Sequence, residues 1–381
     1  MSAPRPFKVD IPQEKIDQIY ARLRCASWPA EPDDAGMWQY GTELGFLRSF
    51  VEYWLTEYDW RAAEAELNAW PQFMTDIDGI DVHFYHVRGT GNGRALILTH
   101  GWPGSTLEFL GMIDRLAYPA RYGRNPESGF DVVIPSLPGY GFSQPPSRPI
   151  GPRRIASMWR KLMIEKLGYR RFGAHGGDWG SAVSTWLGAD HADVVAGIHL
   201  NMVASWSRDR HPPESDDEAE YRRELARVQS RDFAYHHVQT SQPQTIAIAL
   251  SDSPLGYAAW VLEKFNSWSD SPNGLDDRFR RDDLITNLMI SLVNDAAATA
   301  IWLYRGRAVE AATGAYATLR VDVPTGVALF PKEFIPYPPR AVAERTYNIT
   351  QWTRMPAGGH FAALEEPCTL SDDIRRFFSF L

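Results

Sequence analysis

The hydrophobic positions of this 381-residue chain change their spacing along the sequence, and each spacing is typical of a different kind of structure. Over roughly the first 70 residues apolar side chains recur every three to four positions, which predicts helices over Pro12–Arg24, 40–56 and 61–70. From Thr75 onwards they alternate with polar ones, as in a half-buried strand. Residues 95–98 are continuously apolar, as in a strand buried on both faces.

Further short apolar segments are typical of strands, and helical stretches separate most of them. They cover residues 130–134, 169–175, 195–200, 327–330 and 351–355. Strands that alternate with helices favour right-handed crossovers and a mostly parallel sheet. The basic stretch Arg153–Arg171 is expected to be such a crossover helix, packed on the core, rather than a helix lying on a membrane surface. The sequence therefore predicts an α/β fold.

Between about Trp206 and Arg320 a helical pattern interrupts the alternation of strands and helices, which predicts a helical lid inserted into the core. Its polar opening, Arg208–Glu220, contains the acidic run Glu214–Glu220, for which we expect a solvated loop. The chain is accordingly divided into an N-terminal helical extension (1–74), a first core segment (75–205), the lid (206–320) and a second core segment (321–381).

Composition narrows the class of protein. The 44% hydrophobic and 23% charged residues are those of a soluble globular protein. A formal charge of −8 argues against a nucleic-acid partner, because phosphate binding needs a basic face. Cys25 and Cys368 form neither a metal-ligand spacing nor a disulfide framework. Without a signal-like start or an apolar run of about 18 residues, we expect a soluble, cytoplasmic protein with no membrane span.

The segment Gly176-Gly177-Asp178-Trp179-Gly180 lies between a predicted strand and a predicted helix. A sharp strand-to-helix turn flanked by small residues is the nucleophile elbow of α/β-hydrolases. The small residues are needed because the turn is strained and crowded. Asp178 at the apex would attack as a carboxylate and form an ester, which favours an alkyl carbon as the electrophile. That chemistry indicates epoxide ring opening or displacement of a halide.

A hydrolase of this fold also needs donors for an oxyanion, a histidine late in the chain and an acid before that histidine. His100-Gly101-Trp102-Pro103 follows the strand 95–98, so the backbone N–H groups of Trp102 and Trp179 are the predicted oxyanion donors. His360, in a glycine-rich loop after a strand, is the predicted base. Other histidines lack that order and loop context: His236 and His237 fall in the predicted lid, His83 and His86 lie before the sheet core, and His175 is adjacent to the elbow.

The position of the acid is less clear from the residues alone. Glu333 follows the strand 327–330 and occupies a strand-end loop. Asp322 and Glu344 are its rivals, and Glu333 leads them only modestly on position.

Taken together, these motifs resemble the epoxide hydrolases of the microsomal type, including the juvenile-hormone epoxide hydrolases. The resemblance covers nearly the whole chain. It rests on residues 7–24 with Trp28-Pro29, 100–105, 135–143, 176–181, 252–256 with 262–265, 323–326 and 358–367. It implies an Asp nucleophile at Asp178, a Glu acid at Glu333 and a His base at His360.

The resemblance also implies two lid tyrosines that hydrogen-bond the epoxide oxygen. Tyr235, before His236-His237-Val238-Gln239, and Tyr304, in Trp302-Leu303-Tyr304, match the two family positions. Microsomal members carry an N-terminal membrane anchor, whereas this chain begins directly at the helical segment, so their localisation is not transferred.

We therefore expect an epoxide hydrolase that needs no metal or cofactor and converts a small apolar epoxide to a vicinal diol. A homodimer is compatible with the sequence. A haloalkane or haloacid dehalogenase, which would share Asp178, and a non-catalytic ligand-binding homologue are the alternatives.

Overall fold

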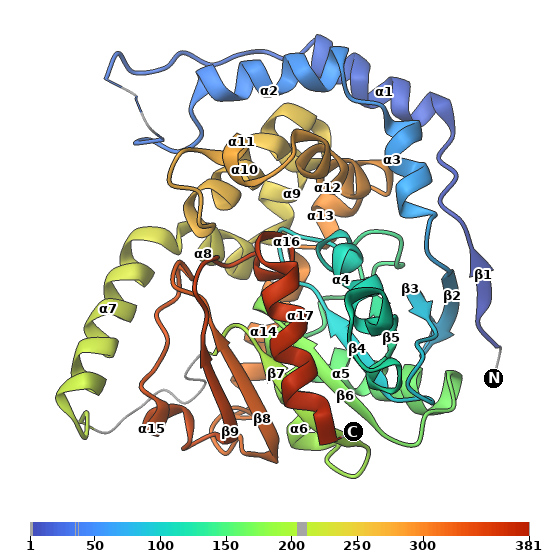
Figure 1. The fold of residues 1–381 in the computed structure, drawn as a ribbon. Helices are drawn as coiled ribbons and strands as arrows, with labels where there is room; N and C mark the ends of the chain where they lie inside the picture. The colour runs from blue at the N-terminus through green and yellow to red at the C-terminus, as the bar shows by residue number, and fades with distance from the viewer. Residues whose placement is uncertain (1–2, 35, 37, 204–211, 381) are drawn as a thin grey trace.

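A single nine-stranded sheet runs through the computed structural model, which describes residues 3–34, 36, 38–203 and 212–380 (Figure 1). The strand order is β1-β2-β3-β5-β4-β6-β7-β8-β9. From β5 to β9 in that row all neighbours are parallel, whereas β1, β2 and β3 extend one edge as antiparallel strands. The strands are β1 (Arg5–Phe7), β2 (Gln72–Ile77), β3 (Ile80–Val87), β4 (Ala95–Thr99), β5 (Asp131–Pro135), β6 (Phe172–Gly176), β7 (Val195–Leu200), β8 (Val321–Leu329) and β9 (Tyr347–Arg354).

Helices cover both faces of the parallel strands, which confirms the predicted α/β arrangement. On β4, Leu96 and Leu98 belong to one apolar cluster and Ile97 to another, because successive side chains of a strand point to opposite faces. The first cluster includes α4 (Leu107–Ala117), α16 (Ala362–Glu365) and α17 (Pro367–Phe377). The second includes α5 (Pro152–Lys161) and α6 (Asp178–Asp190).

The basic stretch of the sequence forms α5, which continues into a π-helical turn at Leu162–Lys166. Its apolar side chains, among them Ile155 and Trp159, are buried, and the helix packs against α6. The prediction of a core-packed crossover helix is therefore confirmed. Outside these layers lie α15 (Arg340–Ala343) and short 3-10 turns at 119–122, 126–128 and 378–380.

The lid connects β7 to β8 and is mostly helical in the part that the structure describes, 212–320. Its helices are α7 (Asp216–Asp232), α8 (Ala234–Ser241), α9 (Pro243–Asp252), α10 (Pro254–Trp268), α11 (Leu275–Arg278), α12 (Arg281–Val293), α13 (Ala296–Thr299) and α14 (Trp302–Ala312). The predicted start of the lid at Trp206 lies outside the described residues, as do residues 208–211 of its predicted polar opening. Apart from α7, these helices lie over the carboxyl ends of the parallel strands (Figure 1).

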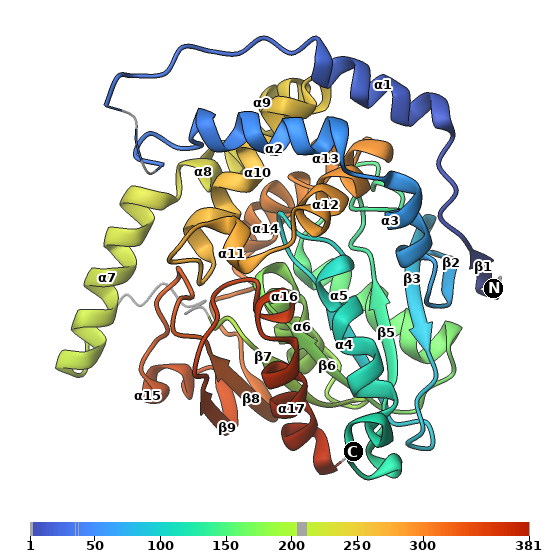
Figure 2. The ribbon, with the colours of Figure 1, turned by 45° about the horizontal axis from the view of Figure 1, so that its top comes forward.

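The N-terminal helices brace the lid. Figure 2 shows α1 (Gln13–Arg24) and α2 (Leu44–Thr56) running across the lid helices, followed by α3 (Trp60–Leu67). Polar contacts join the two parts: the Tyr58 hydroxyl lies 3.0 Å from Thr286 Oγ1, and Tyr53 donates to Asp282 over 3.0 Å. The predicted helix at 40–56 begins four residues late, because Gly41 has a φ of +104° and interrupts it.

The expectation of a solvated loop at Glu214–Glu220 was wrong. Helix α7 begins at Asp216, and the Ser215 side chain caps it by accepting from the Glu218 N–H. Acidic side chains in a first helical turn are stabilised by the helix dipole, and that signal was missed. Glu218 itself is buried and forms ion pairs with Arg345 and Arg222.

Within the described residues no single helix has the length and apolar character needed to cross a membrane. Two consecutive helix pairs, α9 with α10 and α12 with the segment 296–312, reach that length and composition only when joined across bends of 115° and 91°.

Candidate active site

The turn between β6 and α6 has the crowding and strain of a nucleophile elbow. Asp178 has a φ of +46°, in the left-handed region that side chains other than glycine seldom adopt. The neighbouring backbones are so close that a Cβ on Gly176 would lie 2.2 Å from the carbonyl carbon of Gly180. A Cβ on Gly180 would lie 1.8 Å from the backbone oxygen of Thr99. The turn therefore requires glycine at both positions and presents Asp178 at the carboxyl edge of the sheet.

His360 and Glu333 come from the loops after β9 and β8, at the same edge of the sheet. The two loops are joined by a bridge between Lys332 and Gly359. His360 Nδ1 lies 2.9 Å and 3.1 Å from the two carboxyl oxygens of Glu333, and His360 Nε2 lies 3.5 Å from Asp178 Oδ2. The structure thus brings the three predicted residues together in the order acid, imidazole, carboxylate.

The rival acids are far more exposed. The side chains of Asp322 and Glu344 are 82% and 44% exposed and pair with Arg320 and Arg340, whereas the Glu333 side chain is fully buried. The rival histidines bond to other groups or lie at the lid surface. His83 bonds Ser136 and Gln72, His86 bonds Tyr169, His175 bonds His199, and His237 is exposed.

The imidazole of His360 lies between two carboxylates. Burial alone lowers its pKa, but the negative charges and hydrogen bonds of Glu333 and Asp178 outweigh burial and raise the pKa well above the ordinary value. Loss of either negative charge would lower it again. The protonation state of His360 is therefore coupled to the charge on Asp178.

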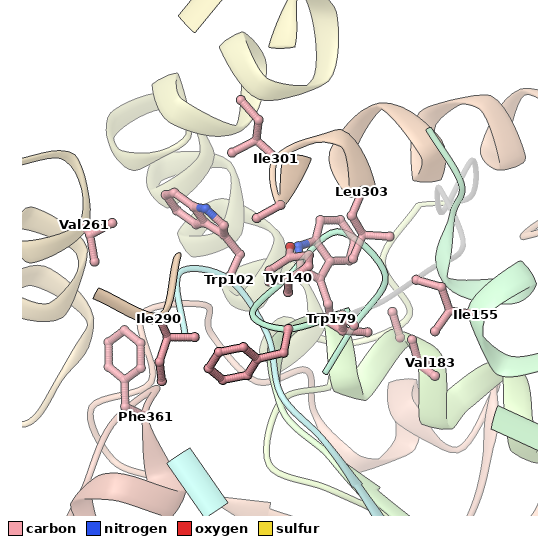
Figure 3. Packing of buried hydrophobic residues seen from close by; sticks show 14 of the residues in the cluster. Trp102, Tyr140, Ile155, Trp179, Val183, Val261, Ile290, Ile301, Leu303 and Phe361 are labelled. Atoms are coloured by element: carbon pink, nitrogen blue, oxygen red, sulfur yellow. The ribbon is translucent and has the colours of Figure 1, made fainter. Parts of the chain in front are cut away.

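One of the two predicted oxyanion donors contacts the carboxylate of Asp178. The Trp102 N–H donates to Asp178 Oδ1 over 2.8 Å. The Trp179 N–H belongs to the first turn of α6, where backbone amides have no acceptor within the helix. The Trp102 loop is attached to the lid, since the Asn287 side-chain amide donates to the Pro103 carbonyl over 2.9 Å. Figure 3 shows both indoles among buried side chains of the core, such as Val183, and of the lid, such as Leu303.

The two lid tyrosines lie next to these indoles. Tyr235 on α8 and Tyr304 on α14 are 4% and 2% exposed, and their hydroxyls are hydrogen-bonded to each other. The Tyr235 ring stacks on Trp102 at 5.3 Å between centroids, and the Tyr304 ring meets Trp179 edge to face at 4.7 Å. Burial, with the charge of Asp178, raises the pKa of Tyr235 well above its ordinary value. For Tyr304 burial is again the largest cause of a pKa raised well above 10, so both phenols carry their protons at neutral pH.

A cavity of about 150 Å³ between core and lid joins Asp178 to both tyrosines. Its other walls are largely apolar, with Phe233, Met202 and Ile335 among them. His236 also lines it, and burial lowers the pKa of that histidine to about 4, so its ring is neutral there. Such a cavity suits a small apolar ligand with one oxygen to be bound.

Sequence reasoning missed Glu108. A second, much smaller cavity of about 10 Å³, enough for a single water molecule, is bordered by Glu108, Asp178 and His360. Glu108 is half-buried, but its carboxyl group reaches inward: a Cβ on Gly104 would lie 1.6 Å from Glu108 Oε1. Burial raises the pKa of Glu108 to about 8. Glu108 follows the motif 100–105 and lies in the first turn of α4. Nothing in the sequence indicates that its side chain points inward.

No group of three or more His, Cys, Asp or Glu side chains in the described part of the chain is arranged to hold a metal ion. The fold and the site define an α/β-hydrolase with a carboxylate at the nucleophile position and phenols in the lid.

Comparison with known proteins identifies the family more closely than the fold and the site do. The family model for the epoxide hydrolase N terminus matches residues 4–109, and that for the alpha/beta hydrolase fold matches residues 94–290. Epoxide hydrolase 1 of Oryctolagus cuniculus is 35% identical over 98% of this chain and 88% of its own. The juvenile hormone epoxide hydrolase of Bombyx mori superimposes with a TM-score of 0.91 at 28% identity, covering 100% of this chain and 95% of that one. The Aspergillus niger epoxide hydrolase does so with a TM-score of 0.86 at 30% identity, over 100% and 97%.

The chain therefore belongs to the epoxide hydrolase family of α/β-hydrolases and is an enzyme of that family, as the sequence motifs predict.

Proposed function

We propose that this enzyme converts an apolar epoxide to a vicinal diol through a covalent ester on Asp178. The observation that carries the proposal is that a carboxylate at the nucleophile elbow and two protonated phenols, Tyr235 and Tyr304, line one cavity. A carboxylate nucleophile opposite hydrogen-bond donors is what ring opening requires, because a carbon–oxygen bond forms as negative charge develops on the epoxide oxygen.

In the first step Asp178 attacks a ring carbon. The Trp102 N–H already holds Oδ1, so Oδ1 becomes the carbonyl oxygen of the ester and Oδ2 becomes the attacking atom. The ring carbon–oxygen bond breaks, its electron pair stays on oxygen, and that oxygen takes a proton from the lid phenols. The phenols stabilise the developing charge in the transition state more than in the ground state.

In the second step water hydrolyses the ester. Esterification removes the negative charge of Asp178, one of the causes that hold the pKa of His360 high. The imidazole, still oriented by Glu333, then releases its proton to solvent and becomes a competent base that takes a proton from the attacking water. The small cavity bordered by His360, Glu108 and Asp178 has room for one water molecule, which could attack the ester carbon from there. The N–H groups of Trp102 and Trp179 stabilise the resulting oxyanion. As it collapses, the bond between the acyl carbon and the diol oxygen breaks, that oxygen takes the second proton of the water, and the Asp178 carboxylate is restored.

The lid phenols also distinguish this reaction from dehalogenation. A leaving halide takes no proton and gains little from two phenols, whereas an opening epoxide gains from both. The names of the relatives agree with the epoxide reading: the Oryctolagus cuniculus, Bombyx mori and Aspergillus niger proteins are all epoxide hydrolases.

A single turnover in heavy-oxygen water tests the mechanism. Water that attacks the ester carbonyl leaves its oxygen in the Asp178 carboxylate, so peptide mass spectrometry should find the label in the peptide containing Asp178 and none in the first diol. Label in the diol alone would indicate direct hydration of the epoxide and would overturn the covalent route. The Asp178→Asn variant, analysed in parallel, controls for label entering other carboxylates.

A further inference from the structure

Lys264 is a buried cation that the mechanism above does not use. It belongs to α10 in the lid, and its side chain is only 10% exposed. Burying a lysine ammonium is costly unless its surroundings compensate. Besides the carboxylate of Glu263, three aromatic rings surround Lys264: its Nζ lies 4.9 Å from the ring centroid of Tyr235, 5.6 Å from that of Trp260 and 5.9 Å from that of Trp268.

The shortest of the three ring contacts is to Tyr235, one of the two phenols that line the cavity. An ammonium within about 6 Å of an aromatic centroid is attracted by the electron-rich face of the ring. As Tyr235 gives its proton to the opening epoxide, negative charge grows on the phenol oxygen and spreads into the ring. The attraction to Lys264 therefore becomes stronger in the transition state than in the ground state, which is the condition for accelerating a step.

Glu263 opposes this effect. Its carboxylate contacts the Lys264 ammonium, and its charge is one of the causes that raise the pKa of Tyr235. The Glu263 side chain is 29% exposed, so solvent screens its charge more than it screens that of Lys264.

We propose that Lys264 is a positioning residue for epoxide opening, acting through the face of the Tyr235 ring to stabilise the phenol as it loses its proton. This role rests on the proposed function. The proton passes from Tyr235 to the epoxide oxygen, Lys264 keeps its own proton throughout, and the phenol regains from solvent the proton that His360 releases before ester hydrolysis.

The experiment is a double-mutant cycle between Lys264 and Tyr235, read as the pre-steady-state rate of alkylation by an aryl epoxide such as styrene oxide. Lys264→Met keeps the length of the side chain and removes the charge, and it should slow alkylation about 10- to 30-fold, as expected for a desolvated cation–π contact. The later hydrolysis of the ester should change less than twofold. Lys264→Arg should restore most of the alkylation rate, because guanidinium also binds aromatic faces.

In the Tyr235→Phe background the Lys264→Met change should have almost no further effect, since no phenol remains to stabilise. Multiplicative losses in the double variant, or equal slowing of alkylation and hydrolysis, would mean that Lys264 merely supports the lid and would overturn the proposal. A normal alkylation rate in Tyr235→Phe alone would instead refute the role of the phenol in the proposed function, so the two failures are distinguishable.

Two further variants separate the ring contact from the ion pair. Glu263→Gln removes the opposing carboxylate and should leave alkylation unchanged or faster. Slowing equal to that of Lys264→Met would show that the ion pair is what matters, and would contradict the proposal. Lys161→Met, which removes a lysine bound to Asp78 on the outer surface of α5, is the matched control and should alkylate at the rate of the unaltered enzyme.

Discussion

Replacing Glu333 by Gln tests the charge behind the base with the smallest change of shape. The carboxylate is fully buried and holds His360 Nδ1 through contacts of 2.9 Å and 3.1 Å. Opposite unit charges about 4 Å apart attract each other by about 4 kcal/mol at an effective dielectric constant of about 20. The amide keeps one hydrogen-bond acceptor, so we expect a loss of about 3 kcal/mol in the hydrolytic step, or about 150-fold in rate.

The assay must resolve the two chemical steps. Intact mass spectrometry of quenched samples follows the alkylated enzyme, which should accumulate in Glu333→Gln because His360 is a weaker base without the carboxylate. Formation of the ester should be slowed far less, since Asp178 and the lid phenols are unchanged. The ratio of esterified to free enzyme during turnover is thus the expected signature.

The rival acids provide the matched controls. Asp322→Asn and Glu344→Gln make the same chemical change at exposed side chains that pair with Arg320 and Arg340. Both variants should hydrolyse the ester at the normal rate. If Glu333→Gln turned over normally while Asp322→Asn accumulated ester, the assignment of the acid would be refuted.

Three further outcomes follow from the same geometry. Tyr235→Phe and Tyr304→Phe should each raise the barrier to alkylation by about 1–3 kcal/mol, and the double variant should be nearly inactive. Stopped-flow tryptophan fluorescence measures the alkylation rate, and an unchanged rate in the double variant would reopen the dehalogenase alternative. Glu108→Gln should slow ester hydrolysis about 10-fold and leave alkylation intact, as judged by quenched intact mass, whereas equal slowing of both steps would place Glu108 outside the water site. Asp178→Asn removes a negative charge that raises the pKa of His360, so the imidazole of the variant should titrate at a lower pH than that of the unaltered enzyme. NMR titration measures this, and identical curves would contradict the coupling between the charge of Asp178 and the protonation of His360.

The elements that could be predicted from sequence are those with a strong local signal. Helix α1 matches its amphipathic pattern to within one residue, and β4 matches its continuous apolar run. The elbow at Asp178 was predictable because its crowded backbone tolerates only glycine at neighbouring positions, and glycine is visible in a sequence.

The rest depends on contacts between segments that are distant in the chain. An acidic run is normally exposed, which predicts a solvated loop at Glu218, yet Arg345, 127 residues further on, pairs with the buried Glu218 carboxylate. Glu108 and Lys264 raise the same difficulty. Each is a charged residue on an amphipathic helix, and only the packed structure shows that one borders a water-sized cavity and the other an aromatic cluster. Hydrophobic periodicity describes one helix or strand at a time, whereas the surroundings of Glu108, Glu218 and Lys264 depend on how two elements pack against each other.

The two chemical steps need opposite groups, and the fold separates them on the two sides of Asp178. In the proposed mechanism the core supplies the base and its acid from strand-end loops that follow β8 and β9 of the parallel sheet. The lid would supply the proton donors, so their distance from Asp178 depends on how firmly the lid is held. The N-terminal extension contributes no predicted site residue, but Tyr53 and Tyr58 attach it to α12 through Asp282 and Thr286. The same helix α12 carries Asn287, which bonds to the Trp102 loop. Helix α12 thus connects the extension to the loop of Trp102, whose N–H holds Asp178 Oδ1.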